Sequence, residues 1–534
     1  MAKTAKIVIH PLYQIGEISP RLYSAFLEPI GTMVNGTMYN PKHKLADEQG
    51  FRTDIINALK DTNVPAVRLP GGNFVSGWEW KDSIGPKEQR KGHLDLAWHQ
   101  YIPNDVGHDE YLQWAEKVNT EALYTINLGT GNINDAIHLV EYTNHEGGTY
   151  WSDLRKQYGH EKPYGVKTWY LGNETDGPWQ IGSWEKDPRG YGVFANEVSK
   201  AIKWVDGNIE TVACVSCSPF MAHYPEWDHS VIEQCYESVD YISMHHYHIA
   251  PVGDYKALLG GSVYFEDYIN TEVALCDYMQ TKLRADKKMM LSFDEYAAFM
   301  KPGREFRYGG GIHNLYADHY NFDPTRKFIR HDPDNMDAKF SFPPHGDMID
   351  VLANSSILLA LLRHADRVKI GCMTSGLMTL VASNHDQIWK SAAFYPFTQL
   401  MQYGRGVSLQ PSVSCDTFDI PGYAVDDNSQ YKTKEGVPYI DCAAAYDEAN
   451  NAVNLFVINR NEEEDNDVQI DVSAFKDYKF IEHIELFSDD MEARNTYENP
   501  DAIKPMIHQN TTFESGILTS NAKRLSWNLF RFAK

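Results

Sequence analysis

Two carboxylates in this sequence occupy positions that suit acid–base and nucleophilic chemistry. Glu174 lies in Trp169–Trp179, WYLGNETDGPW, where apolar residues give way to a polar turn between tryptophans. Glu295 follows another apolar run, within MMLSFDEYAAF. A carboxyl pair can cleave a glycosidic bond when one group protonates the leaving oxygen and the other attacks the sugar from the opposite face. An ordinary solvated turn is the alternative interpretation of Glu174 alone, so the elements that position both residues decide between them.

Short apolar runs alternate with amphipathic stretches from about Leu22 onward, as strands alternate with helices in α/β proteins. This pattern predicts a (β/α)8 TIM barrel over residues 21–405, although it does not exclude an open doubly wound sheet. The first strand lacks a following G-x-G-x-x-G, which argues against a nucleotide-binding fold. The predicted strands are Leu22–Phe26, Pro65–Leu69, Leu123–Leu128, Lys167–Leu171, Thr211–Val215, Tyr241–His245, Met289–Phe293 and Arg367–Ile370. The predicted helices lie within residues 51–61, 109–118, 134–143, 192–205, 263–283 and 347–364.

The pattern changes near Gly406, where short apolar runs are separated by polar turns with few helical stretches. This predicts an all-β sandwich domain over residues 406–534. Residues 1–20 hold one or two further strands, which we expect to join that sandwich. Residues 300–345 lack periodicity and form a predicted insertion, of the length that is usually functional or mobile. The predicted sandwich strands are Tyr439–Tyr446, Val453–Asn459, Val468–Val472, Phe480–Phe487 and Leu525–Phe532.

Composition excludes some classes of partner. The 534 residues carry a formal net charge of −24, which disfavours nucleic acid and anionic membranes because both need basic patches. Residues 1–20 contain no apolar run long enough for a signal peptide or membrane span, so we expect a cytoplasmic protein. The 7 cysteines are scattered, and the single C-x-x-C at Cys214 and Cys217 has no second pair, which favours free thiols over a metal or redox site.

A barrel would place its active site at the C-terminal ends of its strands. Glu174 and Glu295 end the predicted fourth and seventh strands, so they would face each other across the mouth. The proton donor of such a pair needs a raised pKa, which a neighbouring negative charge provides. Arg68, in VRLPGGN at the end of the second strand, is predicted to hold Glu295 ionised and oriented. A surface ion pair is the alternative for Arg68.

Three histidines cluster near the end of the sixth strand. His245 is predicted to join the network around Glu295. Zinc ligation by His245, His246 and His248 is the alternative, but H-E-x-x-H and an obvious ligand from a third strand are missing, so no metal is expected.

Several motifs in order resemble the α-L-arabinofuranosidases of glycoside hydrolase family 51, and the resemblance covers nearly the whole chain. They are LYSAFLEPIG, VRLPGGNFVSGWEWKDSIGP, TINLGTGNINDAIHLVEY, TWYLGNETDGPWQIG, YISMHHYH and LSFDEYAAF, followed by HADRVKI and LSWNLFRF. The resemblance implies a retaining exo-acting hydrolase of terminal arabinofuranosyl residues, a barrel with a C-terminal sandwich, no cofactor, and neutral arabinose-containing oligosaccharides as substrates. It also implies an intracellular homo-oligomer, often a hexamer.

The resemblance further assigns roles. It implies that Glu174 is the acid/base, Glu295 the nucleophile, and Asn173 a contact of the sugar 2-hydroxyl. It also implies that Arg68 and His245 support the nucleophile. The remaining matches are substrate-binding positions: Glu28, Asn73 and Tyr247 for the furanosyl unit, and Trp98 at the subsite entrance.

Some positions depart from the family pattern and leave the sugar open. Pro29 stands where His is usual, Tyr296 where Trp is usual, and Ser391 where Gln normally touches the sugar; GCMTSGLMTL lacks the usual Ala-Gln-Leu-Val-Asn run. Such changes would fit the same mechanism on another glycoside, in a galactofuranosidase, a β-xylosidase or an endo-glucanase. A carbohydrate-binding protein without catalysis is a further alternative.

Overall fold

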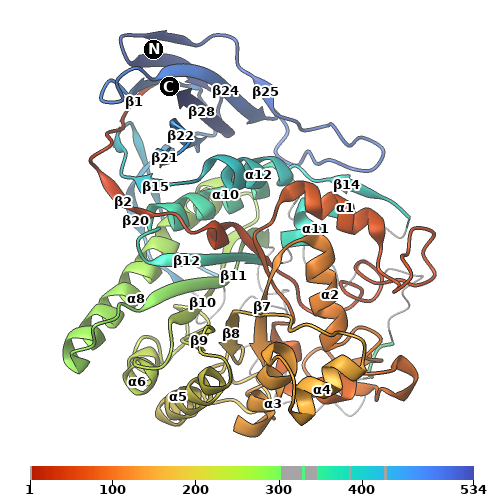
Figure 1. Cartoon of the computed structure of the whole chain (residues 1–534). Helices are drawn as coiled ribbons and strands as arrows, with labels where there is room; N and C mark the ends of the chain where they lie inside the picture. Colours follow the sequence, from red (N-terminus) through yellow and green to blue (C-terminus); the bar gives the residue numbers. More distant parts are fainter. Residues whose placement is uncertain (1–2, 302–326, 331–345, 375, 384–385, 426–429) are drawn as a thin grey trace.

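The computed structural model describes residues 3–301, 327–330, 346–374, 376–383, 386–425 and 430–534. Most of the predicted insertion at 300–345 therefore lies outside the described residues. Figure 1 shows helices packed around a central sheet, with a β-rich part above them that contains both chain termini. Among the described helices, none has the length and apolar character needed to cross a membrane.

Eight parallel strands close into a barrel in the order β10-β11-β12-β3-β4-β7-β8-β9. This confirms the predicted TIM barrel, and every predicted barrel strand is present. β10 and β11 are longer than predicted because they continue to pair beyond the barrel rim, from Tyr247 opposite Ala297 to Pro251 opposite Lys301. The barrel strands are β3 Ser24–Phe26, β4 Ala66–Arg68, β7 Glu121–Ile126, β8 Thr168–Leu171, β9 Glu210–Cys214, β10 Tyr241–Pro251, β11 Met290–Lys301 and β12 Val368–Thr374.

The helices between the strands cover the outside of the barrel (Figure 1). All six predicted helices are present, and the structure adds short ones that the pattern did not reveal. One of these, α4, has the polar sequence YWSDLRKQ, which offers little apolar periodicity. The helices are α1 Thr53–Thr62, α2 His108–Val118, α3 Ile133–Asn144, α4 Tyr150–Gln157, α5 Pro188–Val205, α6 Glu226–Cys235, α7 Tyr255–Leu259, α8 Gly261–Leu283, α10 Met348–Arg363, α11 Gly376–Leu380 and α12 Phe394–Tyr403.

Two sheets form the β-rich part and pack around a shared apolar core. One has the order β16-β1-β23-β27-β26 and the other β2-β15-β21-β22-β28-β24-β25. The N-terminal strands belong to these sheets, as predicted, because β1 pairs with β23 and β2 pairs with β15. Their bounds are β1 Lys3–Val8, β2 Gln14–Glu17, β15 Val407–Leu409, β16 Ser412–Ser414, β21 Ile440–Asp447, β22 Ala452–Asn459, β23 Asn466–Asp471, β24 Lys479–Phe487, β25 Met506–Ile507, β26 Thr512–Glu514, β27 Ile517–Ala522 and β28 Ser526–Ala533.

Helix α10 lies between the barrel and the β-rich part. Its sequence is apolar on almost every side, as expected for a helix that is buried all round. At its end, Arg363 donates to Asp441 of β21 over 2.7 Å, and Arg460 lies 3.5 Å from the same carboxylate. Burial alone would raise the pKa of Asp441, but the two arginines outweigh burial and hold that pKa below its ordinary value. One buried carboxylate therefore contacts two arginines where the two parts meet, and Glu266 is a second partner of Arg363.

Replacing Asp441 with Asn leaves the buried Arg460 without its carboxylate partner and leaves Arg363 with Glu266 alone. We expect Asp441→Asn to lower the free energy of unfolding by about 3–5 kcal/mol, measured by urea denaturation. Asp416→Asn is the matched control, because Asp416 has a side chain that is 64% exposed and pairs loosely with Lys3. It should change stability by no more than about 0.5 kcal/mol. Equal losses in the two variants would contradict a structural role for the Asp441 cluster.

Candidate functional site

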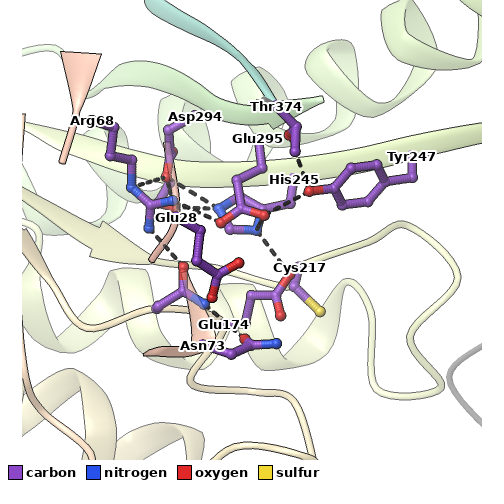
Figure 2. A network of polar contacts seen from close by, with 12 residues as sticks. Glu28, Arg68, Asn73, Glu174, Cys217, His245, Tyr247, Asp294, Glu295 and Thr374 are labelled. Carbon is purple, nitrogen blue, oxygen red and sulfur yellow. Dashed lines mark hydrogen bonds and ion pairs between the residues drawn. The ribbon is translucent and has the colours of Figure 1, made fainter. Parts of the chain in front are cut away.

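The polar side chains at the C-terminal end of the barrel converge on one site (Figure 2). Arg68 ends β4, Glu174 follows β8 by three residues, His245 and Tyr247 lie in β10, and Glu295 lies in β11. The structure thus brings together residues that lie far apart in the sequence, as the strand-end argument predicted.

Arg68 is the centre of this network and is fully buried. Its Nη1 donates to Oε1 of Glu295 over 2.7 Å, and its Nη2 donates to Oδ1 of Asn173 over 2.7 Å. Its Nε lies 3.3 Å from Oδ2 of Asp294. The planar guanidinium therefore fixes the nucleophile candidate and the amide beside Glu174 in one geometry.

The second oxygen of Glu295 faces two other groups. Tyr247 donates its hydroxyl to Oε2 of Glu295 over 2.8 Å, and Nδ1 of His245 lies 3.7 Å from the same oxygen. Burial raises the pKa of Glu295 and the negative charge of Glu174 adds to this, whereas the positive charges of His245 and Arg68 act in the opposite direction. The hydrogen bonds from Arg68 and Tyr247 favour the ionised carboxylate.

His245 connects the two candidate catalytic carboxylates. Its Nδ1 lies 3.0 Å from Oε1 of Glu174, and its Nε2 lies 3.1 Å from Oδ2 of Asp294. Burial alone would lower the pKa of His245, but the charges of Glu295 and Asp294 outweigh burial and place it well above the ordinary value. A protonated imidazole can donate from both nitrogens, so it shields the neighbouring carboxylates from each other.

Glu174 occupies a backbone conformation that L residues rarely adopt. Its φ is +43°, in the left-handed region, and Gly172 two residues earlier has φ +95°. A non-glycine residue held there stores roughly 1–3 kcal/mol of strain, which occurs most often at functional sites. The turn directs the carboxylate towards His245, and Trp179 donates its indole N–H to Oε2 over 2.9 Å. The tryptophan that closes the stretch WYLGNETDGPW therefore orients its glutamate.

The predicted substrate-binding residues lie next to this network. Glu28 accepts hydrogen bonds from the Phe74 amide over 3.0 Å and from the Trp98 indole over 2.6 Å. Burial, followed by the charge of Glu295, raises the pKa of Glu28 well above its ordinary value. Asn73 accepts from the side-chain amide of Asn173 over 3.0 Å. All the predicted site residues are therefore close together.

Glycine is required where the loop after β4 passes Glu28. At Gly72 the φ is +76°, and an added Cβ would lie 2.2 Å from the carboxyl carbon of Glu28. This close approach lets the amide of Phe74, two residues after Gly72, reach the Glu28 carboxylate.

The other two histidines of the cluster point away from the site. His246 and His248 are buried behind β10, where His246 packs on Phe265 and His248 stacks on Tyr264. Among the described residues, Glu174, His245 and Glu295 form a group whose ligand atoms all lie within 4.8 Å of one another. The zinc site considered for His245, His246 and His248 together does not fit this geometry.

Tyr296, one of the departures from the family pattern, points away from the carboxylates. Tyr296 is fully buried between β11 and α8, with its ring packed edge-on against Phe265 and Phe293. It therefore belongs to the core and does not line the site. Ser391 is also buried, and its amide donates to the carbonyl of Leu380. Pro29 follows Glu28, and its carbonyl accepts a hydrogen bond from Gln100.

Phe328, Ile329 and Arg330 of the predicted insertion contact the hairpin that carries Trp98. This hairpin consists of β5 His93–Asp95 and β6 Gln100–Ile102. Ile329 donates to the carbonyl of His99 and accepts from the amide of Tyr101, each over 2.9 Å. Residues 328–330 thus support the loop at the predicted subsite entrance.

Three further residues belong to the site but were not identified from sequence. Asp294 contacts Arg68 and His245, Trp179 contacts Glu174, and Thr374 at the end of β12 contacts Tyr247. Asp294 adjoins Glu295, so the strand-end rule contained the signal for it, whereas Thr374 lies beyond the predicted end of the eighth strand at Ile370. The sequence does not show which strand-end side chains point inward.

Comparison with known proteins identifies relatives along the whole chain. Residues 58–260 match the family model described as alpha-L-arabinofuranosidase 1 domain, and residues 336–526 match the alpha-L-arabinofuranosidase C-terminal domain. The intracellular exo-alpha-(1->5)-L-arabinofuranosidase of Acetivibrio thermocellus is 38% identical, with 100% of both chains covered. The intracellular exo-alpha-(1->5)-L-arabinofuranosidase 1 of Bacillus subtilis is 37% identical, covering 100% of this chain and 99% of the relative. The solved structure of a family 51 alpha-L-arabinofuranosidase from Bifidobacterium longum aligns with a TM-score of 0.84 at 28% identity, covering 100% of each chain.

Replacing Arg68 with Met tests whether its charge balances Asp294 and Glu295. We expect Arg68→Met to lower the free energy of unfolding by about 3–5 kcal/mol near neutral pH, because two carboxylates lose their buried cation. Without the positive charge of Arg68, which acts to lower it, the pKa of Glu295 rises further in the folded state, so the folded protein binds more protons than the unfolded chain. Stability must therefore fall as pH rises, and the deficit should be larger at pH 8 than at pH 5, measured by denaturation at both.

Arg21→Met is the matched control for this experiment. Arg21 also pairs with two carboxylates, Glu121 and Glu210, but its side chain is 18% exposed. Arg21→Met should lower the free energy of unfolding by about 1 kcal/mol or less, with little dependence on pH, because solvent screens partly exposed ion pairs. A deficit of Arg68→Met that does not vary with pH would contradict the charge-balance explanation.

Proposed function

Because this chain belongs to the α-L-arabinofuranosidases of glycoside hydrolase family 51, we propose that it releases terminal α-L-arabinofuranosyl residues from arabino-oligosaccharides as a retaining, exo-acting hydrolase. The carboxylates of Glu174 and Glu295 carry this proposal, since their oxygens approach within 4.8 Å. A separation of about 5–5.5 Å is typical of retaining enzymes, whereas inverting enzymes need about 6.5–9.5 Å to admit a water molecule.

Glu295 acts as the nucleophile in this mechanism. Arg68 holds its Oε1, which leaves Oε2 to attack the anomeric carbon. A bond forms between Oε2 and the sugar while the bond to the leaving oxygen breaks. Glu174 donates its proton to that oxygen, so the leaving alcohol departs neutral.

The second half-reaction reverses these roles. Glu174 takes a proton from a water molecule as that water attacks the anomeric carbon, and Glu295 departs as a carboxylate. Arg68 and His245 then stabilise the returning negative charge. The side chain that served as the acid therefore serves as the base, with net retention of configuration.

The neighbouring residues bind the sugar. We assign Asn173 to the 2-hydroxyl, because it is held between Arg68 and Asn73 beside the acid/base. Hydrogen bonds to that hydroxyl strengthen in the transition state and contribute several kcal/mol. Glu28, Asn73 and Tyr247 are assigned to the rest of the furanosyl ring, and Trp98 to the subsite entrance.

The names of the relatives suggest the finer substrate and the location. Two of them are intracellular enzymes named for α-(1→5) linkages, so α-(1→5)-linked arabino-oligosaccharides in the cytoplasm form part of the proposal. The proposed reaction requires no cofactor. We also propose that the chain forms a homo-oligomer, a hexamer by family resemblance.

A panel of 4-nitrophenyl glycosides tests the choice of sugar. We expect rapid release of nitrophenol from the α-L-arabinofuranoside and about 10- to 200-fold lower kcat/KM on the β-D-galactofuranoside and β-D-xyloside, because one mismatched substrate contact costs about 1–3 kcal/mol. An inert arabinofuranoside with turnover of another glycoside would support the alternative enzymes. Carbohydrate binding without turnover of any glycoside would indicate a binding protein.

Variants of the two carboxylates test their roles. Glu295→Ala should abolish formation of the glycosyl-enzyme, monitored by intact-mass spectrometry. Glu174→Ala should lower kcat/KM by about 10²–10⁴-fold on oligosaccharides, whose leaving groups need a proton, and far less on activated aryl arabinofuranosides. Glu116→Ala, at a surface glutamate of α2, is the control for an unspecific loss. Equal losses of Glu174→Ala on both substrate types would contradict its assignment as the acid.

A further inference from the structure

Thr374 contacts the network around the nucleophile from the strand that neighbours β11. It is the last residue of β12 and is 2% exposed. Its Oγ1 lies 3.0 Å from the hydroxyl oxygen of Tyr247, which in turn lies 2.8 Å from Oε2 of Glu295 (Figure 2). β10, β11 and β12 are consecutive in the barrel, so Tyr247 and Thr374 approach Glu295 from the strands on either side of it.

The number of available protons decides which group donates in each of the two hydrogen bonds that join Thr374, Tyr247 and Glu295. An ionised Glu295 only accepts hydrogen bonds, and a phenol has a single proton to donate. Tyr247 must therefore donate its proton to Glu295, and the contact with Thr374 must use a lone pair of the Tyr247 oxygen. It follows that Thr374 donates its own proton to Tyr247, in the sequence Thr374 to Tyr247 to Glu295.

On the basis of the function proposed above, we propose that Thr374 is a positioning residue, which acts through Tyr247 to direct the phenol proton at the attacking oxygen of Glu295. A hydrogen bond from the Thr374 hydroxyl occupies a lone pair of the Tyr247 oxygen and makes the Tyr247 O–H a stronger donor. It also removes an alternative acceptor, because a Thr374 hydroxyl that donates to Tyr247 does not attract the phenol proton to itself.

The electrostatics of Tyr247 agree with this direction. Burial and the negative charge of Glu295 raise the pKa of Tyr247 well above its ordinary value, whereas the hydrogen bond with Thr374 acts to lower it. The phenol therefore keeps its proton, and Thr374 makes that proton easier to share with the carboxylate.

A purely structural role predicts different behaviour. The backbone of Thr374 pairs with Phe26 of β3, and any residue at this position can keep that pairing. Valine has nearly the same shape as threonine but no hydroxyl, so Thr374→Val removes the hydrogen bond and preserves packing. Serine restores the hydroxyl without the methyl group.

The test compares these variants on 4-nitrophenyl α-L-arabinofuranoside. We expect Thr374→Val to lower kcat/KM by about 5- to 20-fold, the effect of weakening one hydrogen bond to a charged group, and Thr374→Ser to recover most of the loss. The acidic limb of the kcat/KM profile should move to higher pH in Thr374→Val, because the ionised form of Glu295 loses stabilisation. Thermal melting of each variant checks that the fold is intact.

A double-mutant cycle separates action through Tyr247 from other effects. In a Tyr247→Phe background, Thr374→Val should cause no further loss, since the hydroxyl that relays its effect is gone. Thr125→Val is the matched control: Thr125 is buried on β7, and within the described part of the chain its hydroxyl has no hydrogen-bond partner. This control should retain wild-type kinetics.

The outcomes distinguish this inference from the proposed function. A wild-type enzyme that cleaves the arabinofuranoside, with Thr374→Val equally active or with an unchanged pH profile, would overturn the role of Thr374 and leave the function intact. A further loss of activity from Thr374→Val in the Tyr247→Phe background would also overturn the role of Thr374 and leave the function intact. A wild-type chain that cleaves no glycoside would overturn the function, and the inference with it.

Discussion

The pairing of one buried guanidinium with the carboxylates of β11 is the interaction on which the site depends. Arg68 lies in a closed barrel with no access to water, so its charge is tolerable only because Asp294 and Glu295 face it. The same pairing fixes one oxygen of Glu295 and leaves the other facing Tyr247 and His245. Charge balance in the core and orientation of the proposed nucleophile are therefore one requirement.

This arrangement also explains how the two carboxylates proposed to be catalytic, Glu174 and Glu295, can lie so close together. Like charges at this separation repel, and burial makes ionisation harder. His245, protonated between Glu174 and Asp294, supplies the compensating positive charge. The strained turn at Glu174 then brings the proposed acid/base to that imidazole. The reaction geometry results from a balance of charges that rigid strands hold in place.

Much of this site could be predicted from sequence, because apolar runs mark barrel strands and strand ends mark the mouth. Arg68 and Glu295 are 227 residues apart, yet the strand-end rule placed them together. The extended pairing of β10 with β11 and the inward position of Thr374 were not predictable, since both depend on contacts between strands. Tyr296, which departs from the family pattern, follows Glu295 directly but packs in the core, because adjacent residues of a strand point to opposite faces.

The most direct measurement of the central claim is the stereochemistry of transfer to methanol. Hydrolysis of an aryl α-L-arabinofuranoside in aqueous methanol traps the sugar as a methyl furanoside, and proton NMR identifies its anomer. Close carboxylates and a covalent intermediate on Glu295 predict the methyl α-L-arabinofuranoside as the product. The β anomer as the first methyl furanoside would show direct displacement and contradict the account.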